Sequence, residues 1–299
     1  MSPLMSPATL DERHKSARAY SDVARWLEER ELAGKATRTL DGDERYTAAL
    51  LNANPHLHVR EFTPDVLKTF LANVPRASRR KYASHLNVLF RWAVTNELVD
   101  RNPMDRVPQM ARPKPKIVPT FNEAEVEALC AGTEGILYLL LFDTGIRSSE
   151  ARALQVRHVL VDRKVLTIYQ GKGAKDRLVP LTTRLQHALN DWFLLDALGP
   201  RDYLWSCRPG GYGVRRDREI GPTSIKTWHA ERLEEAGVPY RKLHATRHTF
   251  ATRCLRRGIS LLAVSRMLGH ASIKTTADLY AHLAVEDYAA ELELLEVAE

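Results

Sequence analysis

Residues 244–250 read His244-Ala245-Thr246-Arg247-His248-Thr249-Phe250 and place two histidines and one arginine within five residues. Leu268-Gly269-His270 follows, and Tyr280 comes ten residues after that histidine. Imidazoles exchange protons near neutral pH, whereas a guanidinium group remains charged. A cationic cluster just upstream of a phenol therefore predicts a tyrosine nucleophile that attacks a phosphate held by positive charge.

Two cations far upstream are predicted to complete the phosphate-binding site. A glycine breaks the buried helix predicted at 136–142, so Arg147 lies at a junction between two helices, where its side chain projects. Lys172 lies in a glycine-flanked basic hairpin at 171–177. Cleaving a phosphodiester without a metal gathers charge on the non-bridging oxygens, and the forked guanidinium groups of Arg147 and Arg247 match that geometry.

The reaction also needs a nucleophile, a base that accepts its proton and an acid for the leaving 5′-oxygen. The predicted roles are Tyr280 as nucleophile, His244 as base, Lys172 as acid, His270 as hydrogen-bond donor to a phosphate oxygen, Glu150 as the residue that orients a neighbouring base, and His248 as a supporting residue.

Ordinary structural roles are the alternative for these residues. A single tyrosine is usually core or surface, Arg147 alone is more often a salt-bridge partner, and Lys172 can be a solvated hairpin tip. His244 and His248, four residues apart on one helix face, could bind a metal. The stretch lacks the glutamate of a metalloprotease helix, Arg247 would set a fixed cation beside the ion, and no third ligand lies nearby. We therefore predict no metal and no cofactor.

Charge and composition favour a nucleic-acid partner. The 299 residues carry a net charge of +7 with a pI near 9.3, and the length predicts two domains. Both main blocks are basic, with net charges of +4 over 1–112 and +9 over 113–279, whereas the last twenty residues hold six acids and no base. Three scattered cysteines, a longest apolar run of seven residues and no signal-peptide pattern predict a cytoplasmic protein without membrane contact.

Residues 1–112 are predicted to form a helical module, with 1–15 as a disordered tail. Apolar spacing predicts helices at 17–32, 39–51 and 77–98, and Thr63 is predicted to cap another. The predicted DNA contacts here are Arg76, Arg79, Arg80 and Lys81, at the start of the longest helix. An ordinary solvated charged face is the alternative reading. A proline-rich linker follows at 113–119 and carries two more predicted contacts, Lys114 and Lys116.

Residues 120–299 are predicted to form a mixed domain. Short strands are expected at 159–161, 165–169 and 178–181, among helices that include 182–198, 223–236, 244–257 and 260–268. Four more basic residues in its loops and hairpin are predicted to contact DNA: Lys175, Arg177, Arg215 and Arg216. A final acidic amphipathic helix is expected at 284–296, facing protein rather than DNA.

Together these motifs resemble the tyrosine recombinases of the phage integrase family. The resemblance rests on Thr144-Gly145-Ile146-Arg147-Ser148-Ser149-Glu150, Gly171-Lys172-Gly173, residues 244–248, Leu268-Gly269-His270, and Thr275-Thr276 with Tyr280. It covers about 113–299 strongly, and Tyr280 follows His270 by ten residues where nine is more frequent. It implies a mainly α fold with a small antiparallel sheet, in which a four-helix SAM-like core-DNA-binding domain and the catalytic domain form a DNA clamp.

The resemblance also implies an activity and partners. Arg147, Lys172, His244, Arg247 and His270 would surround the scissile phosphate, and Tyr280 would form a 3′-phosphotyrosine without ATP. The expected partners are double-stranded DNA core or attachment sites and further copies of the chain, which form a tetramer through the C-terminal helix and pass through a Holliday junction. A phage or mobile-element integrase is the main expectation. An Xer-type chromosome-dimer recombinase, a type IB topoisomerase and a non-catalytic DNA-binding protein are the alternatives.

Overall fold

The computed structural model describes residues 17–111, 118–169, 176–195, 197–206 and 216–280. The chain divides into two compact units, Met1–Lys114 and Pro115–Glu299. This division falls inside the segment at 113–119 that the sequence predicts as a proline-rich linker. Each unit is described by itself below.

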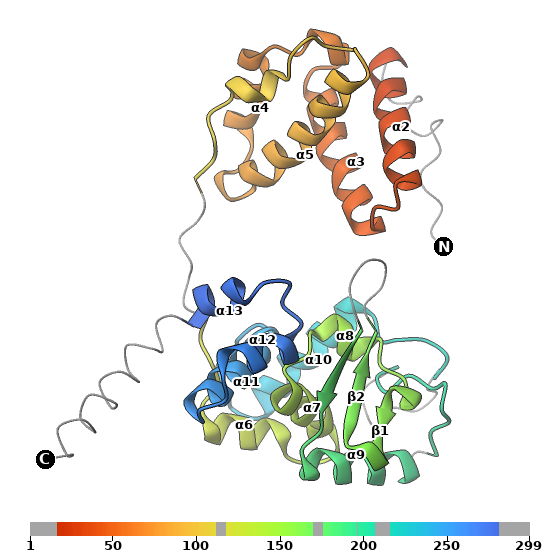
Figure 1. Ribbon diagram of the computed structural model, residues 1–299, viewed down its shortest axis with the longest axis vertical. Coiled ribbons are helices and arrows are strands. Elements are labelled where there is room, and N and C mark those ends of the chain that lie inside the picture. The colour runs from red at the N-terminus through yellow and green to blue at the C-terminus, as the bar shows by residue number, and fades with distance from the viewer. Residues whose placement is uncertain (1–16, 112–117, 170–175, 196, 207–215, 281–299) are drawn as a thin grey trace, which may run out of the picture. The chain divides into compact units, whose positions relative to one another are not determined.

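Unit 1 is a bundle of helices (Figure 1). Its elements are α2 (Ala17–Leu32), α3 (Thr37–Ala53), α4 (Pro64–Asn73) and α5 (Arg76–Thr95), with short 3₁₀ turns at Val59–Glu61 and Pro103–Arg106. Their apolar stripes meet in one core, whose members include Trp26, Leu50, Leu67, Leu86 and Phe90. The helical periodicity of the sequence thus predicted α2, α3 and α5 to within a few residues, and the Thr63 cap predicted the start of α4.

Local capping and one buried, hydrogen-bonded carboxylate hold unit 1 together. The Thr63 hydroxyl accepts a hydrogen bond from the Val66 amide at the start of α4, which confirms the predicted cap. Asp43 on α3 is fully buried and binds Arg30 of α2 at 2.6 Å and His85 of α5. A buried carboxylate needs such partners, so Asp43 ties three helices to one another.

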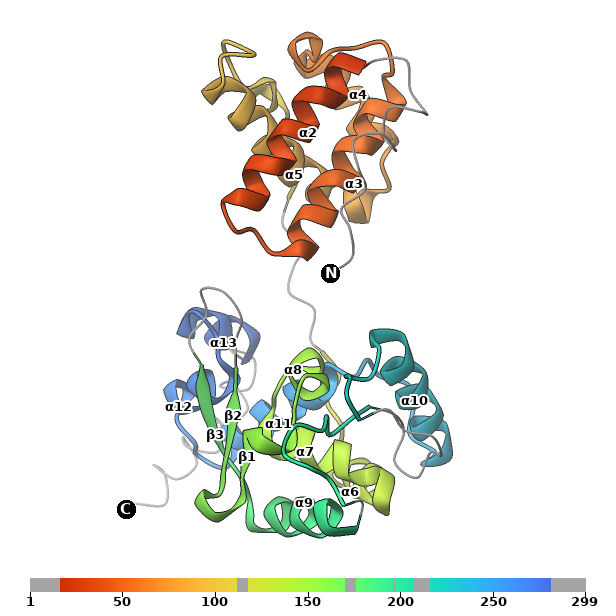
Figure 2. The ribbon, with the colours of Figure 1, turned by 90° about the vertical axis from the view of Figure 1, so that its right-hand side faces the viewer.

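Unit 2 is mostly helical, with one small sheet (Figure 2). The sheet has the order β1 (Val159–Leu160), β2 (Val165–Ile168), β3 (Arg177–Pro180), and both pairings are antiparallel. The helices are α6 (Glu123–Cys130), α7 (Ile136–Thr144), α8 (Ser148–Arg152), α9 (Thr183–Leu195), α10 (Pro222–Glu235), α11 (Ala245–Arg256), α12 (Leu261–Leu268) and α13 (Ile273–Tyr280). The expected fold class, mainly α with a small antiparallel sheet, is therefore confirmed.

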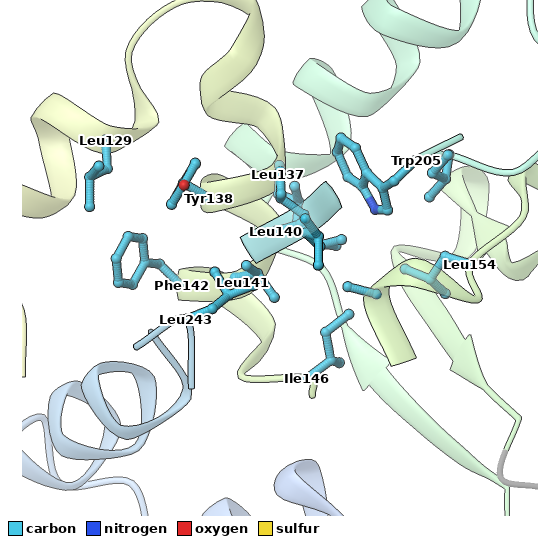
Figure 3. Close-up of a cluster of buried hydrophobic side chains, with 14 of the residues drawn as sticks. Leu129, Leu137, Tyr138, Leu140, Leu141, Phe142, Ile146, Leu154, Trp205 and Leu243 are labelled. Carbon is cyan, nitrogen blue, oxygen red and sulfur yellow. The ribbon is translucent and has the colours of Figure 1, made fainter. Parts of the chain in front are cut away.

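Helix α7 is the centre of unit 2. Its first seven residues, 136–142, are apolar on all sides, and Leu137, Tyr138, Leu140 and Leu141 are buried almost completely (Figure 3). A helix without a polar face is stable only when neighbours cover it on every side. Figure 2 shows the sheet on one side of α7 and α10 on the other, and side chains from both enter the same core. Helix α11, which carries Arg247 and His248, packs along α7.

Gly145 ends α7 in a left-handed conformation, with φ of +62°. A Cβ at this position would lie 2.2 Å from the Cδ1 atom of Phe250 on α11, which is closer than any real contact. Only glycine meets both conditions, because it has no Cβ and adopts positive φ without strain. The resulting tight turn places Arg147 immediately before the first residue of α8.

Gly269 ends α12 in the same way, with φ of +66°. Its amide binds the Arg266 carbonyl, and the His270 amide binds the Ser265 carbonyl. These bonds satisfy two of the last carbonyls of the helix and direct the chain into His270. Two glycine turns therefore carry two of the predicted site residues, Arg147 and His270.

Candidate active site

Arg147 is held by the carboxylate of Glu150, three residues further on. Glu150 accepts a hydrogen bond from the Arg147 amide at 2.7 Å and another from its Nη1 atom at 2.8 Å. The Arg147 side chain remains 37% exposed, while that of Glu150 is 11% exposed. The sequence predicted that Glu150 orients a base; in the structure it orients this arginine and leaves part of the guanidinium facing solvent.

Arg247 lies on α11 and is only 3% exposed. Its Nη1 atom donates to the Gly145 carbonyl at 2.9 Å and its Nη2 atom to the Leu268 carbonyl at 2.7 Å. These carbonyls belong to the two glycine turns at the ends of α7 and α12. A buried guanidinium bound to fixed main-chain oxygens is held in one orientation, so Arg247 fixes both turns relative to α11.

Three arginines converge on the C-terminal end of α12. Successive carbonyls, those of Met267, Leu268 and Gly269, accept hydrogen bonds from Arg177, Arg247 and Arg147 respectively. The last carbonyls of a helix have no partner within the helix and carry partial negative charge. The guanidinium groups satisfy these oxygens, and their own positive charge accumulates beside His270.

Arg177, which the sequence predicts as a DNA contact, is bound within the protein instead of pointing into solvent. Arg177 is the first residue of β3, and its side chain is 9% exposed. It forms two hydrogen bonds with the Glu150 carboxylate, at 2.9 Å and 2.7 Å, and donates from Nε to Met267. The basic hairpin pattern predicts a cation that contacts DNA. The carboxylate that binds Arg177 lies 27 residues away in sequence, so the pattern could not reveal it.

The histidines lie beside these arginines. The rings of His244 and His248 meet edge to face with centroids 5.0 Å apart, which is the spacing expected one helical turn apart. His270 is half-buried, and its Nδ1 atom lies 2.7 Å from the hydroxyl of the buried Thr276 on α13. That contact fixes the ring and leaves Nε2 as the atom available for a ligand.

The surroundings favour the neutral form of all three imidazoles. Burial, followed by the charges of Arg247 and Arg147, lowers the pKa of His270 to about 4. Burial lowers the pKa of His248 to about 4, with further contributions from His244 and Arg247. Burial, followed by the charges of Arg247 and Arg147, also lowers the pKa of His244. An anion bound here would offset this repulsion and raise all three pKa values.

The surroundings of Glu150 favour its charged form. Burial acts to raise the pKa of Glu150, but hydrogen bonds and charge from Arg177 and Arg147 outweigh it and hold the pKa below its usual value. Glu150 is therefore ionised at neutral pH. Arg147, Arg177 and Arg247 set three positive charges against this one carboxylate, which leaves an excess of positive charge suited to an anion such as a phosphodiester.

Several predicted residues lie outside the described part of the chain. They are Lys172, Lys175, Arg215, Lys114 and Lys116, together with the tail at 1–15 and the helix at 284–296. Tyr280 is the last residue of α13, the helix that also carries Thr276. The structure thus places the backbone of the predicted nucleophile on an element bonded to His270, and describes nothing of the tyrosine side chain.

The predicted DNA contacts within the described residues differ in their exposure and in their partners. Arg76, Arg80 and Lys81 are exposed on the first turns of α5. Arg79 instead donates from its guanidinium to the carbonyls of Ala72 and Val74 at 2.8 Å, so it closes the end of α4. Arg216 in unit 2 is half-buried, and its own carbonyl accepts a hydrogen bond from Tyr203.

Thr276 is a site residue that sequence reasoning missed. It forms part of the Thr275-Thr276 pair, but the sequence assigned it no role. A hydroxyl six residues after a histidine has no regular helical relation to it. The sequence signal that could have drawn attention to Thr276 was the Thr275-Thr276 pair, one helical turn before Tyr280. The hydrogen bond to His270 gives Thr276 its role, which is to orient that ring.

Metal binding and membrane insertion find no support among the described residues. There, no group of three or more His, Cys, Asp or Glu side chains lies close enough to hold a metal ion. Across the same described segments, every helix is too short or too polar to cross a bilayer.

Comparison with known proteins gives a consistent set of relatives. The model of the phage integrase family matches residues 118–287. Tyrosine recombinase XerD of Ralstonia nicotianae is 33% identical over 216 residues, which are 66% of this chain and 66% of that protein. Tyrosine recombinase XerC of Corynebacterium efficiens is 29% identical over 85% of this chain and 83% of its own length.

Solved structures share the fold at lower identity. A lambda integrase dimer bound to a COC′ core site has a TM-score of 0.69 at 15% identity, over 93% of this chain and 81% of that chain. The Tn1549 transposon integrase in complex with a circular intermediate DNA has a TM-score of 0.67 at 16% identity, over 91% of this chain and 98% of that chain.

Proposed function

The chain belongs to the phage integrase family, whose tyrosine recombinases cut and rejoin DNA strands without metal or ATP, and we propose that it is itself a site-specific DNA recombinase. It breaks one strand through a 3′-phosphotyrosine, frees a 5′-hydroxyl and rejoins the ends to a partner duplex through a Holliday junction. The phosphotyrosine conserves the energy of the broken bond, so the rejoining step needs no further energy source.

In this proposal the side chains carried by the two glycine turns, Arg147 and His270, bind the scissile phosphate. Arg147 supplies the half-exposed guanidinium that faces the non-bridging oxygens, and Arg247 holds the turn beneath it through the Gly145 carbonyl. His270 carries its proton on Nε2 when Nδ1 accepts from Thr276, and this proton is donated to a phosphate oxygen. The developing negative charge thereby meets donors that are already in place.

The remaining residues move protons or attack. Tyr280 is the nucleophile, and His244, neutral before the phosphate binds because its pKa is lowered, accepts the phenolic proton. Lys172, in the segment between β2 and β3, protonates the leaving 5′-oxygen. His248 packs against His244 and supports it.

One observation carries the proposal. Side chains from positions 147, 177, 247 and 270 are brought together around the two glycine turns, although up to 123 residues separate them in sequence. Three cations with one carboxylate form an anion site, and the helix that ends in Tyr280 is bonded to it through Thr276.

The outcome of recombination has two candidates. The sequence favoured a phage or mobile-element integrase, which joins an element to a chromosome. The curated relatives named XerD and XerC favour the second candidate, an Xer-type enzyme that resolves chromosome dimers. Plasmids with two copies of the bound site, either on one molecule or on two, would separate resolution from integration.

We also propose how DNA and further copies bind. Exposed Arg76, Arg80 and Lys81 at the start of α5 contact the DNA backbone of a core or attachment site. Four copies assemble on the paired sites, and the acidic segment at 284–296 docks as a helix on a neighbouring copy. Deleting 284–299 should then spare binding by single copies and prevent pairing of two sites, whereas full recombination by the truncated chain would refute the docking.

A covalent-capture assay tests the reaction. A nicked duplex, whose arms are selected from random sequence by binding to the wild-type chain, traps the adduct because the cut fragment diffuses away. Wild type and Tyr240→Phe, a control at an exposed tyrosine, should form the adduct on a denaturing gel. Tyr280→Phe should bind the same duplex and form none; an adduct with this variant would refute the assignment of the nucleophile.

A further inference from the structure

Arg177 has a contact pattern that the proposed reaction leaves unexplained. Its guanidinium makes a two-fold bond to Glu150 and a third bond to the Met267 carbonyl, and its side chain is 9% exposed. Glu150 receives two further bonds from Arg147. One carboxylate is therefore shared by two arginines, of which only Arg147 reaches the surface.

The charge balance depends on this sharing. Glu150 is 11% exposed, so solvent screens it weakly and its attraction for a neighbouring cation is strong. If Arg147 were its only partner, the carboxylate would offset the very charge that a phosphate is meant to meet. With Arg177 bound on its other side, Glu150 is already neutralised and can orient Arg147 while the net charge of the three groups stays positive.

The geometry agrees with a balancing role. Parallel bonds from two nitrogens of one guanidinium to both oxygens of a carboxylate form the strongest pairing available to arginine. Arg147 donates to Oε1 through Nη1 alone and points Nη2 toward the Gly269 carbonyl. Glu150 thus binds the Arg177 side chain through both of its oxygens and the Arg147 side chain through one. The carboxylate therefore holds the Arg147 guanidinium less strongly than it holds that of Arg177.

We propose that Arg177 is a positioning residue for strand cleavage: it neutralises Glu150, so that Glu150 orients Arg147 without cancelling its charge at the phosphate. This inference rests on the proposed recombinase function. It also assigns β3 a part in the site, since Arg177 is the first residue of that strand and pairs with Ile168 of β2. Arg177 does not touch the phosphate; it acts through Glu150.

A double-mutant cycle in the full-length chain tests this role. The single-turnover rate of adduct formation on the selected nicked duplex is measured for Arg177→Met, Glu150→Gln and the combined variant. Arg177→Met leaves Arg147 alone with a carboxylate, and we expect its rate to fall by at least about thirtyfold. The combined variant removes both charges and restores the balance, so it should cleave at least about tenfold faster than Arg177→Met.

Controls separate the charge effect from folding and from DNA contact. Arg163→Met removes an exposed arginine between β1 and β2 and should cleave at the wild-type rate. Arg177→Met should bind the duplex with unchanged salt dependence, since a lost phosphate contact would reduce that slope by about one. Circular dichroism checks that each variant is folded.

A second pair of variants covers the case in which Arg177→Met does not fold. Arg177→Lys keeps the charge and Arg177→Gln keeps only hydrogen bonding, so the lysine variant should cleave at least about tenfold faster. Equal rates for the lysine and glutamine variants would overturn the inference. It would also be overturned if Arg177→Met slowed cleavage by the same factor in the wild-type chain and in the Glu150→Gln chain. Absence of any adduct with the wild-type chain would instead refute the proposed function, and the inference with it.

Discussion

The substitution Gly145→Ala tests the link between one turn and the whole site. Gly145 lies at φ of +62°, and a Cβ there would meet Phe250 at 2.2 Å. Its carbonyl accepts from Arg247, and the turn that it forms positions Arg147. Alanine should therefore disturb folding and cleavage together.

The expected loss of stability has two parts. Placing an L-residue in the left-handed region costs about 1–2 kcal/mol. Displacing Phe250, which is 6% exposed and packed in a core cluster, costs about 1–3 kcal/mol more. Gly237 provides the matched control, because its φ is +63° and a Cβ there meets no atom within 4 Å. Gly237→Ala should lose only the first part.

Urea unfolding followed by tryptophan fluorescence gives both free energies of unfolding, and the nicked duplex gives the cleavage rates. We expect Gly145→Ala to be less stable than Gly237→Ala by about 1–3 kcal/mol. Its adduct formation should be at least about tenfold slower, whereas Gly237→Ala should cleave at the wild-type rate. Equal losses of stability at the two glycines, or an unchanged cleavage rate for Gly145→Ala, would refute the reasoning.

Three other outcomes are expected. Asp43→Asn should cost about 3 kcal/mol in urea unfolding because it removes the fully buried carboxylate that pairs with Arg30, while Asp65→Asn, which breaks an exposed pair, should cost less than about 0.5 kcal/mol. Thr276→Val should slow adduct formation about tenfold by releasing the His270 ring, with the exposed Thr275→Val as the unchanged control. Since folded His270 has a pKa of about 4 and an unfolded histidine one of about 6.5, the unfolded chain binds more protons between these values. The melting temperature should therefore fall as pH drops through this window, and less steeply for His270→Asn; equal slopes would contradict the assignment.

Much of the fold could be read from local pattern. Helix α2 begins and ends at the predicted residues 17 and 32, and the three strands lie within a residue or two of their predicted ends. Period, caps and glycine breaks act over a few residues, so a linear reading detects them. Two of the predicted site residues are linked to such local features, because Arg147 and His270 stand just after the glycines that end α7 and α12.

The contacts between these residues could not be read in this way. Arg177 was expected to contact DNA because it ends a basic hairpin, and Thr276 received no role at all. Arg177 binds a carboxylate on α8, and Thr276 binds a ring that lies beyond a glycine turn. No period or spacing connects such partners, since the bonds form only after separate elements have packed.

The sequence by itself determined most of the helices and strands of this protein, the glycine turn that ends α7, and the kinds of side chain that a phosphate site needs. These follow from steric limits and propensities within a few residues. Only the tertiary structure decided that Glu150 is shared by Arg147 and Arg177, and that three successive carbonyls at the end of α12 accept hydrogen bonds from three arginines. Charges pair with whatever the fold brings within hydrogen-bond reach, and packing around the apolar helix α7 sets those distances.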